Sequence, residues 1–190
     1  LDATPAGRKL YDTLGFEVEY TLARWTRAVL PRLPSAGRAI PPPGVRLRPA
    51  KAGDMAAIAA YDCAIFGAER IHILDSLHSA APESACVAVG EDDGRVRGYI
   101  LGRPGANFAQ LGPIVADDAR IAEALLDSGL EALAGQPAVV DAGDRHAGFL
   151  ARMAAHGFAR QRPFIRMTRG KVGRFGEPER QFAIAGPELG

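Results

Sequence analysis

The apolar residues of this 190-residue chain repeat with two different periods. Some short runs alternate apolar and polar residues, as half-buried strands do, and others show the three- and four-residue spacing of amphipathic helices. The clearest signal is a pair of alternating runs joined by a turn at Asp92-Asp93-Gly94, which predicts a β-hairpin. Strands are predicted at residues 45–50, 85–90, 96–103, 108–115, 137–142 and 159–170, and helices at 52–67, 67–81, 116–135 and 146–157.

The order from residue 45 onward is therefore strand, two helices, three antiparallel strands, helix, strand, helix and strand. This succession predicts an α+β fold in which helices flank a mixed, mostly antiparallel sheet. The apolar segment Gln181 to Ile184 adds a short strand, expected either at the edge of the sheet or across the linker described below.

One sequence pattern, called the twice-written phrase below, occurs at residues 1–25 and again at 139–167. Each copy has an apolar start ending in Asp-Ala, a helical stretch, a Gly-Phe pair and an alternating strand. Gly15 and Gly157 follow the last helical residue, where a left-handed backbone ends a helix at little cost. The phrase indicates one supersecondary unit used twice, although helix-Gly-strand is common enough to recur by chance.

Between the first copy and residue 45 lies a proline-rich segment at residues 29–44 with no periodic apolar pattern. Such a composition predicts a semi-extended linker that separates two bodies. A proline-rich ligand for a partner domain is the alternative, but the segment lacks a repeated motif.

Composition narrows the function classes only slightly. The chain is 47% hydrophobic and 24% charged with a net charge of +1, so neither nucleic acid nor a membrane surface is predicted as a partner. No run approaches the length of a membrane span. Cys63 and Cys86 lack metal-site spacing and indicate core thiols in a reducing cytoplasm, and none of the four histidines has the spacing of a metal ligand.

Four local phrases occur in sequence: DCAIFGAERIHIL, GYILGRPG, LGPIVADD and FAIAGPELG. Together with the element order they resemble the GNAT superfamily of N-acetyltransferases, and more narrowly the second domain of tandem GNAT proteins. The resemblance implies four parts: a C-terminal remnant of a first GNAT domain (1–28), the linker (29–44), a second GNAT-like domain (45–170) and a tail with a short strand (171–190). It also implies acetyl transfer from acetyl-CoA to a small-molecule primary amine, without a metal.

Acetyl-CoA needs an open strand edge for its pantetheine amides and free N–H groups at a helix N-terminus for its pyrophosphate. The segment 111–121 has this outline, because a strand runs directly into a capped helix. Pro113 cannot donate to a neighbouring strand, so backbone groups near Ile114 and Val115 are expected to be free. The expected cofactor-binding residues are Leu111, Gly112, Ile114, Val115, Ala116, Ala119 and Arg120.

Two departures from the family pattern argue against a cofactor in this domain. Asp117 and Asp118 stand where the superfamily usually has glycines and a positive charge, and carboxylates at a helix N-terminus cap it and repel phosphate. Met153 stands where the family often has a tyrosine that protonates the CoA thiolate, whereas the first copy has Tyr11. The alternative function is therefore a degenerate GNAT-like module that binds a ligand or serves as a scaffold without turnover.

Other polar residues complete the list of candidates. Asp141 ends a buried strand and is a candidate general base or a helix cap. Asp62, Arg70 and Arg103 are candidates for binding an acceptor that carries an amine and an acidic group, and a structural salt link is the alternative. Exposed apolar surface around Phe16 and Trp25 predicts either a homodimer or packing against a preceding domain.

Overall fold

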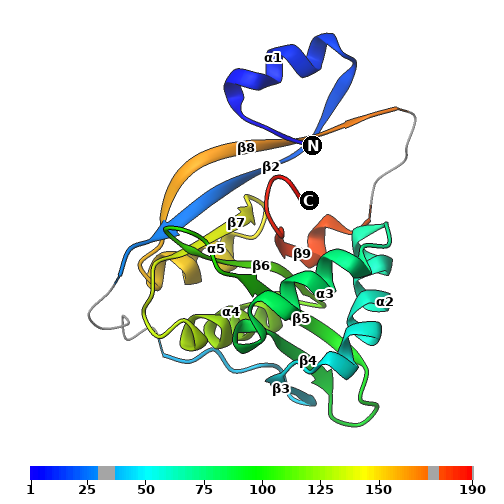
Figure 1. Ribbon diagram of the computed structural model, residues 1–190, viewed down its shortest axis with the longest axis vertical. Coiled ribbons are helices and arrows are strands. Elements are labelled where there is room, and N and C mark those ends of the chain that lie inside the picture. Colours follow the sequence, from blue (N-terminus) through cyan, green and yellow to red (C-terminus); the bar gives the residue numbers. More distant parts are fainter. Residues whose placement is uncertain (30–36, 171–175, 190) are drawn as a thin grey trace.

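The computed structural model describes residues 1–29, 37–170 and 176–189 and has one nine-stranded sheet flanked by helices (Figure 1). The sheet order is β1-β8-β2-β7-β9-β6-β5-β4-β3, and only the β6–β7 pairing is parallel. The predicted α+β class is confirmed. The strands are β1 Asp2–Ala3, β2 Phe16–Arg27, β3 Val45–Pro49, β4 Cys86–Gly90, β5 Val96–Arg103, β6 Ala109–Ala116, β7 Ala138–Gly143, β8 Ala159–Arg169 and β9 Gln181–Ala183.

The helices lie on both faces of the sheet. They are α1 Pro5–Thr13, α2 Met55–Phe66, α3 Ile71–Ala80, α4 Ala119–Ala132 and α5 Ala147–Ala155, with single 3-10 turns at Ala52–Asp54, Pro82–Ser84 and Pro178–Arg180. In the part of the chain described above, no helix is long and apolar enough to cross a bilayer.

Alternation along β5 divides the core into two layers. Ile100 points into the layer under α4 and α5, whereas its neighbours Tyr99 and Leu101 point into the layer under α2 and α3. All three side chains are fully buried. Because helices cover both faces of the sheet here, the side chains on both faces of β4 to β7 are buried, and these strands are nearly continuous apolar runs.

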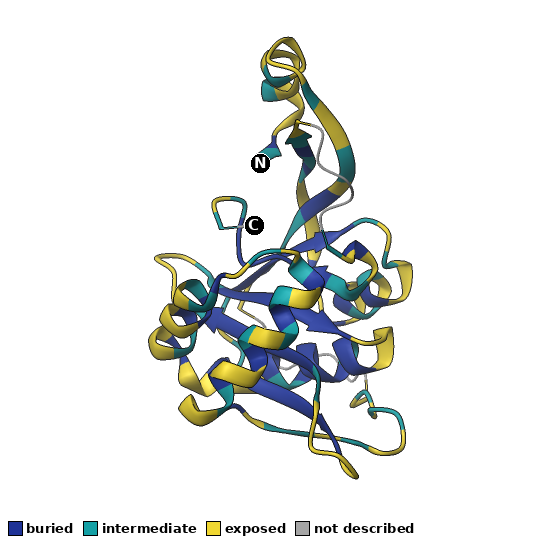
Figure 2. Cartoon of the chain, turned by 90° about the vertical axis from the view of Figure 1, so that its right-hand side faces the viewer, coloured by how far each residue is buried: buried dark blue, intermediate teal, exposed yellow. Residues whose placement is uncertain are grey.

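The N-terminal unit projects from this body. β2 and β8 form a long antiparallel ribbon that rises away from the helices and carries α1 at its far end (Figures 1 and 2). No residue of α1 is buried, and Leu10, Leu14 and Val18 are exposed. Phe16 and Trp25 were expected to be the exposed apolar residues, but Phe16 is half-buried beside Tyr11 and Trp25 packs against the core.

The segment 1–28 is thus part of the same sheet as residues 45–170, because β2 lies between β8 and β7. The region predicted as a linker falls partly at residues 30–36, and the tail partly at 171–175, both outside the described residues. The described end of the linker segment is bound to α4, since the amide of Ala39 donates to Asp127 Oδ2 at 2.7 Å. The origin of 1–28 as the end of an earlier domain stays a prediction.

The twice-written phrase is a structural repeat. Gly15 and Gly157 end the two helices with φ of +77° and +82°, as predicted. Leu22 of β2 faces Phe164 of β8 at the centre of the ribbon. The register of the two strands is constant for two residues on either side of this pair. Toward one end the register shifts at Glu19 of β2, and toward the other it shifts at Gln161 of β8. The two copies are therefore related by a pseudo-two-fold axis through the Leu22–Phe164 pair.

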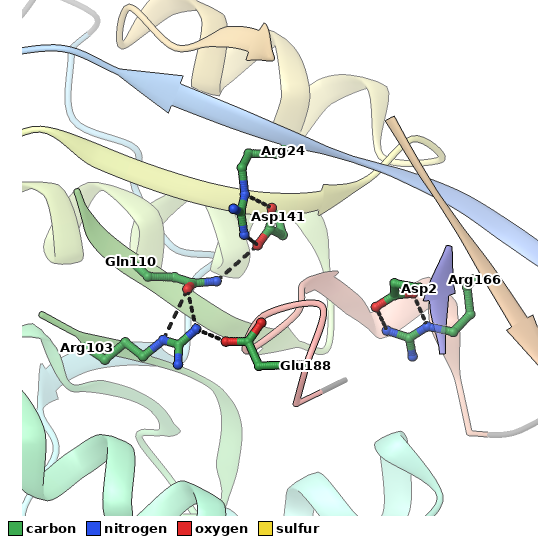
Figure 3. A network of polar contacts seen from close by, with 7 residues as sticks. All are labelled: Asp2, Arg24, Arg103, Gln110, Asp141, Arg166 and Glu188. Atoms are coloured by element: carbon green, nitrogen blue, oxygen red, sulfur yellow. Dashed lines mark hydrogen bonds and ion pairs between the residues drawn. The ribbon is translucent and has the colours of Figure 1, made fainter. Parts of the chain in front are cut away.

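The same symmetry relates two ion pairs (Figure 3). Arg24 of β2 donates to both carboxylate oxygens of Asp141 on β7, at 2.8 Å each. Arg166 of β8 donates to both oxygens of Asp2 on β1, at 2.5 and 2.9 Å. Each arginine thus binds the aspartate of the Asp-Ala pair in the other copy. The Asp2 and Asp141 side chains are almost completely buried, so each carboxylate depends on its arginine.

We expect Arg24→Met and Arg166→Met each to lower the free energy of unfolding by about 3 kcal/mol, because each leaves a buried carboxylate without its counter-ion. Urea unfolding measures both. Arg162→Met, which removes an exposed arginine of the same ribbon, is the control and should change stability by less than about 0.5 kcal/mol. Unchanged unfolding midpoints in the first two variants would contradict this account of the ribbon.

Candidate functional site

The sheet divides between β6 and β7. These parallel strands pair only at their beginnings, where Ala109 faces Ala138 and Gln110 faces Val139. Beyond this point they separate, and β9 lies between them, antiparallel to both. Ala183 faces Ile114 of β6 on one side and Ala142 of β7 on the other, and the amide of Ile184 donates to the carbonyl of Asp141 at 2.9 Å.

Two predictions about this region are wrong. Backbone groups near Ile114 and Val115 were expected to be free, but both residues pair with β9 as well as with β5. The strand at 181–184 was expected at an edge or across the linker, but β9 lies in the interior of the sheet. The reason is the same for both, because a divided sheet leaves buried backbone donors and acceptors that the tail satisfies.

Side chains hold β9 in place. The ring of Phe182 stacks on His146 at 4.1 Å and packs against Phe149. His146 Nε2 donates to the carbonyl of Gln181 at 3.0 Å, and burial lowers the pKa of this imidazole. The amide group of Gln181 donates to the carbonyl of Ile65 at 3.1 Å. β9 is therefore anchored to α5 and to the end of α2 as well as to the strands.

The backbone of β9 also approaches β6 closely. A Cβ atom added at Gly112 would lie 2.2 Å from the carbonyl oxygen of Ile184, and Gly112 has φ of +150°. Only glycine fits this position. Leu111, Gly112, Ile114, Val115 and Ala116, which were predicted to bind the cofactor, are all buried in β6.

The N-terminus of α4 has its own partners. The Asp118 side chain accepts from the amide of Ile121 at 3.0 Å, which confirms the predicted cap. Asp117 accepts from the Tyr61 hydroxyl at 2.8 Å and from Arg180, which precedes β9. Burial, followed by Asp117, raises the pKa of Tyr61, so its phenol stays protonated. Ala119 and Arg120 are exposed in the first turn.

Acetyl-CoA does not fit these residues. Its pantetheine chain would need the gap that β9 fills, and its pyrophosphate would need helix N–H groups free of carboxylates. Neither is provided, because the gap contains residues 181–184 and two aspartates stand at the helix start. In the described part of the chain, no group of three or more His, Cys, Asp or Glu side chains is placed to bind a metal ion.

Asp141 lies in a chain of polar side chains that runs from β2 across β7 and β6 to β5 (Figure 3). Besides its two bonds from Arg24, it accepts from Gln110 Nε2 at 3.0 Å. The Gln110 oxygen in turn accepts from Arg103 at 2.8 and 3.1 Å, and Arg103 also binds Glu188 of the tail. The hydrogen bonds to Asp141 favour the charged guanidinium of Arg24 and raise the pKa of Arg24. Asp141 is fully buried and held by this chain, and its role as a base stays a prediction.

Asp62 and Arg70 bind each other rather than an open pocket. Arg70 donates to both oxygens of Asp62, at 2.8 and 2.9 Å, and Tyr99 donates to the same carboxylate. All three residues are buried between the sheet and the helices α2 and α3. Burial, followed by the charge of Asp62, holds the pKa of Tyr99 well above its usual range. The structural salt link, offered as the alternative reading, is what the structure has.

Tyr11 is remote from the β6–β7 gap. It lies on α1 at the end of the ribbon, with its ring edge-on to Phe16 at 5.6 Å (Figure 1). Met153, at the corresponding place of the second copy, is fully buried in the core. Tyr11 therefore cannot act at the gap in this domain, and a role in another site stays a prediction.

Three features were not foreseen from the sequence. The interior position of β9 has only a weak signal, the apolar run FAIA without a neighbouring strand in sequence. The matched ion pairs have a better one, because an arginine follows each Gly-Phe pair by the same number of residues, at Arg24 and Arg166. The bulge at Glu19 has none.

Comparisons with known proteins agree with the fold. A profile described as "Acetyltransferase (GNAT) domain" matches residues 58–183. A GCN5-related N-acetyltransferase from Sphaerobacter thermophilus aligns with a TM-score of 0.66 at 19% identity, covering 92% of this chain and 61% of that one. A putative acetyltransferase from Pyrococcus horikoshii aligns with a TM-score of 0.69 at 21% identity, covering 100% and 59%.

A tandem GNAT protein from the clavulanic acid biosynthesis pathway aligns at 12% identity with a TM-score of 0.54, covering 87% of this chain and 61% of that one. None of the curated proteins matches the sequence. The chain spans about three fifths of the length of these structural relatives. Because the family profile covers well over half of its residues, this chain belongs to the GNAT acetyltransferase family.

Proposed function

We propose that this chain is the C-terminal part of an acetyl-CoA-dependent N-acetyltransferase that acetylates a small-molecule primary amine in the cytoplasm. In this proposal a preceding domain binds acetyl-CoA, and the domain described above does not. The observation that carries it is the position of β9, which fills the gap that a pantetheine chain would need. The aspartates at the start of α4 support it independently.

The pseudo-two-fold axis supports the presence of a partner body. The axis relates β1 to β7. On the side away from the ribbon, β7 is followed in the sheet by β9 and then β6. β1 ends the described sheet at the corresponding place. We propose that the rest of the first copy extends the sheet past β1 and contains the cofactor site, with Tyr11 at its end of the ribbon. A homodimer joined through the same edge is the alternative arrangement.

Isothermal titration of this chain with acetyl-CoA tests where the cofactor binds. We expect no heat of binding at millimolar ligand, because β9 and the two aspartates occupy the required groups. A longer protein that includes the preceding residues should bind acetyl-CoA and release CoA when an amine is acetylated. Micromolar binding by this chain alone would refute the cofactor-free assignment, and a longer protein without turnover would favour the scaffold alternative.

Removing the carboxylates tests whether β9 alone closes the gap. The variant Asp117→Gly with Asp118→Gly should still fold, since glycine at the Asp118 N-cap lowers stability by only a few tenths of a kcal/mol. At Asp117 it removes a partly exposed ion pair with Arg180, which contributes about 0–1 kcal/mol. We expect it to bind acetyl-CoA no better than the native chain, because β9 stays in place. If binding appears in this variant, charge rather than β9 excludes the cofactor.

Acidification should loosen β9 through His146. Burial lowers the pKa of His146 in the folded state, so the unfolded chain binds the proton more readily. Its contribution to stability is therefore complete above about pH 6.5 and is lost as the pH falls through the lowered pKa. We expect His146→Gln to reduce the loss of stability in urea between about pH 7.5 and 5.5. His72→Gln, which removes an exposed histidine, should leave that loss unchanged.

A further inference from the structure

A cavity of about 400 Å³ lies between the β2–β8 ribbon and the end of α2. Its walls include Phe16, Glu19 and Tyr20 from β2, Phe66 from α2 and Gln181 from β9. Residues 166–169 of β8, together with Leu1, complete the described part of the wall. The cavity is distinct from the filled gap between β6 and β7, and its size suits a small organic molecule.

Glu19 enters this cavity because of a bulge. It is the extra residue of β2 between Val18, which faces Met167, and Tyr20, which faces Arg166. A bulge interrupts the alternation of a strand and redirects a side chain. Glu19 Oε1 is buried and has no hydrogen-bond partner among the residues described. An unpartnered buried acceptor is destabilising, so a donor that the described protein does not supply would stabilise this oxygen.

Three cationic groups border the cavity, and none of them donates to Glu19 Oε1 in the described part of the chain. The amino group of Leu1 donates to the carbonyl of Met167 at 3.0 Å. Arg166 uses its Nε and one terminal nitrogen for the two oxygens of Asp2. Arg169 lies at the exposed rim of the cavity. Burial, opposed by Arg166 and aided by Asp2 and Glu19, raises the pKa of Tyr20, so its phenol is neutral at physiological pH. A positively charged donor that enters the cavity would therefore meet a neutral phenol beside the Glu19 side chain.

The structural repeat provides an internal comparison. The bulge residue at the corresponding place of the other strand is Gln161, which is exposed and neutral. A bulge at this position therefore does not require a carboxylate for its backbone geometry. The charge is present only in the copy where the bulge faces a cavity.

We propose that the cavity binds a small molecule through a protonated amino group, with Glu19 as its counter-ion and its apolar part against the rings of Phe16 and Phe66. An ammonium group has the positive charge and the N–H donors that a lone buried carboxylate oxygen lacks. One face of Phe66 is already covered by Arg70 at 3.7 Å, so its remaining surface meets the ligand. This binding does not depend on where acetyl-CoA binds.

Calorimetric titration with 2-phenylethylamine and with its neutral analogue 2-phenylethanol tests the site. We expect the amine to bind about tenfold more tightly than the alcohol, as a charge-assisted hydrogen bond would give. Glu19→Gln should remove that difference, whereas Gln161→Glu, the matched control at the equivalent bulge, should preserve it. No binding of the amine at millimolar concentration, equal affinity for the two compounds, or a native preference in Glu19→Gln would each overturn the proposal.

Thermal unfolding without ligand separates a binding carboxylate from a structural one. If Glu19 lacks a partner in the free protein, Glu19→Gln leaves the melting temperature unchanged or raises it. A fall of several degrees would mean that the carboxylate is part of a stabilising ion pair, and it would overturn the proposal.

Discussion

The antiparallel pair formed by β2 and β8 is the contact on which the rest of this molecule depends. It joins two copies of one unit, and each copy supplies the arginine that neutralises the buried aspartate of the other. Because a buried carboxylate without its counter-ion is strongly destabilising, neither copy can be removed without exposing the other to that penalty. With this exchange β2 is an interior strand of the sheet, although a proline-rich segment separates it in sequence from residues 45–170.

A second constraint acts where the sheet divides. Strands that separate in a protein core leave backbone donors and acceptors that must find partners. In this chain β9 supplies them, with Phe182 filling the adjacent space against His146 and Phe149. The same segment that completes the hydrogen bonding also removes the opening, so stability of the domain and access to the gap oppose each other. Membership of the family indicates the fold of the chain but not the function of this domain. Access to the gap between β6 and β7 depends on β9.

Local patterns predicted the elements of residues 45–170 well, because periodicity, caps and glycine stops depend on neighbours within a few residues. The Asp118 cap and the left-handed Gly15 and Gly157 are of this kind. The positions of β2 and β9 were not predictable in this way, since their partners lie far along the chain and a strand's own pattern does not identify its neighbour. Glu19 is the extreme case, because a bulge is defined only by the register of the opposite strand.

The order in which the strands are synthesised has a consequence for folding. β2 leaves the ribosome more than a hundred residues before Asp141 and Phe164, its partners on β7 and β8, and β9 follows all of them. The middle of the sheet therefore closes late, through contacts of large sequence separation, which slow folding. Of the described strands, β9 is synthesised last, so the segment that fills the gap between β6 and β7 is also the last to become available.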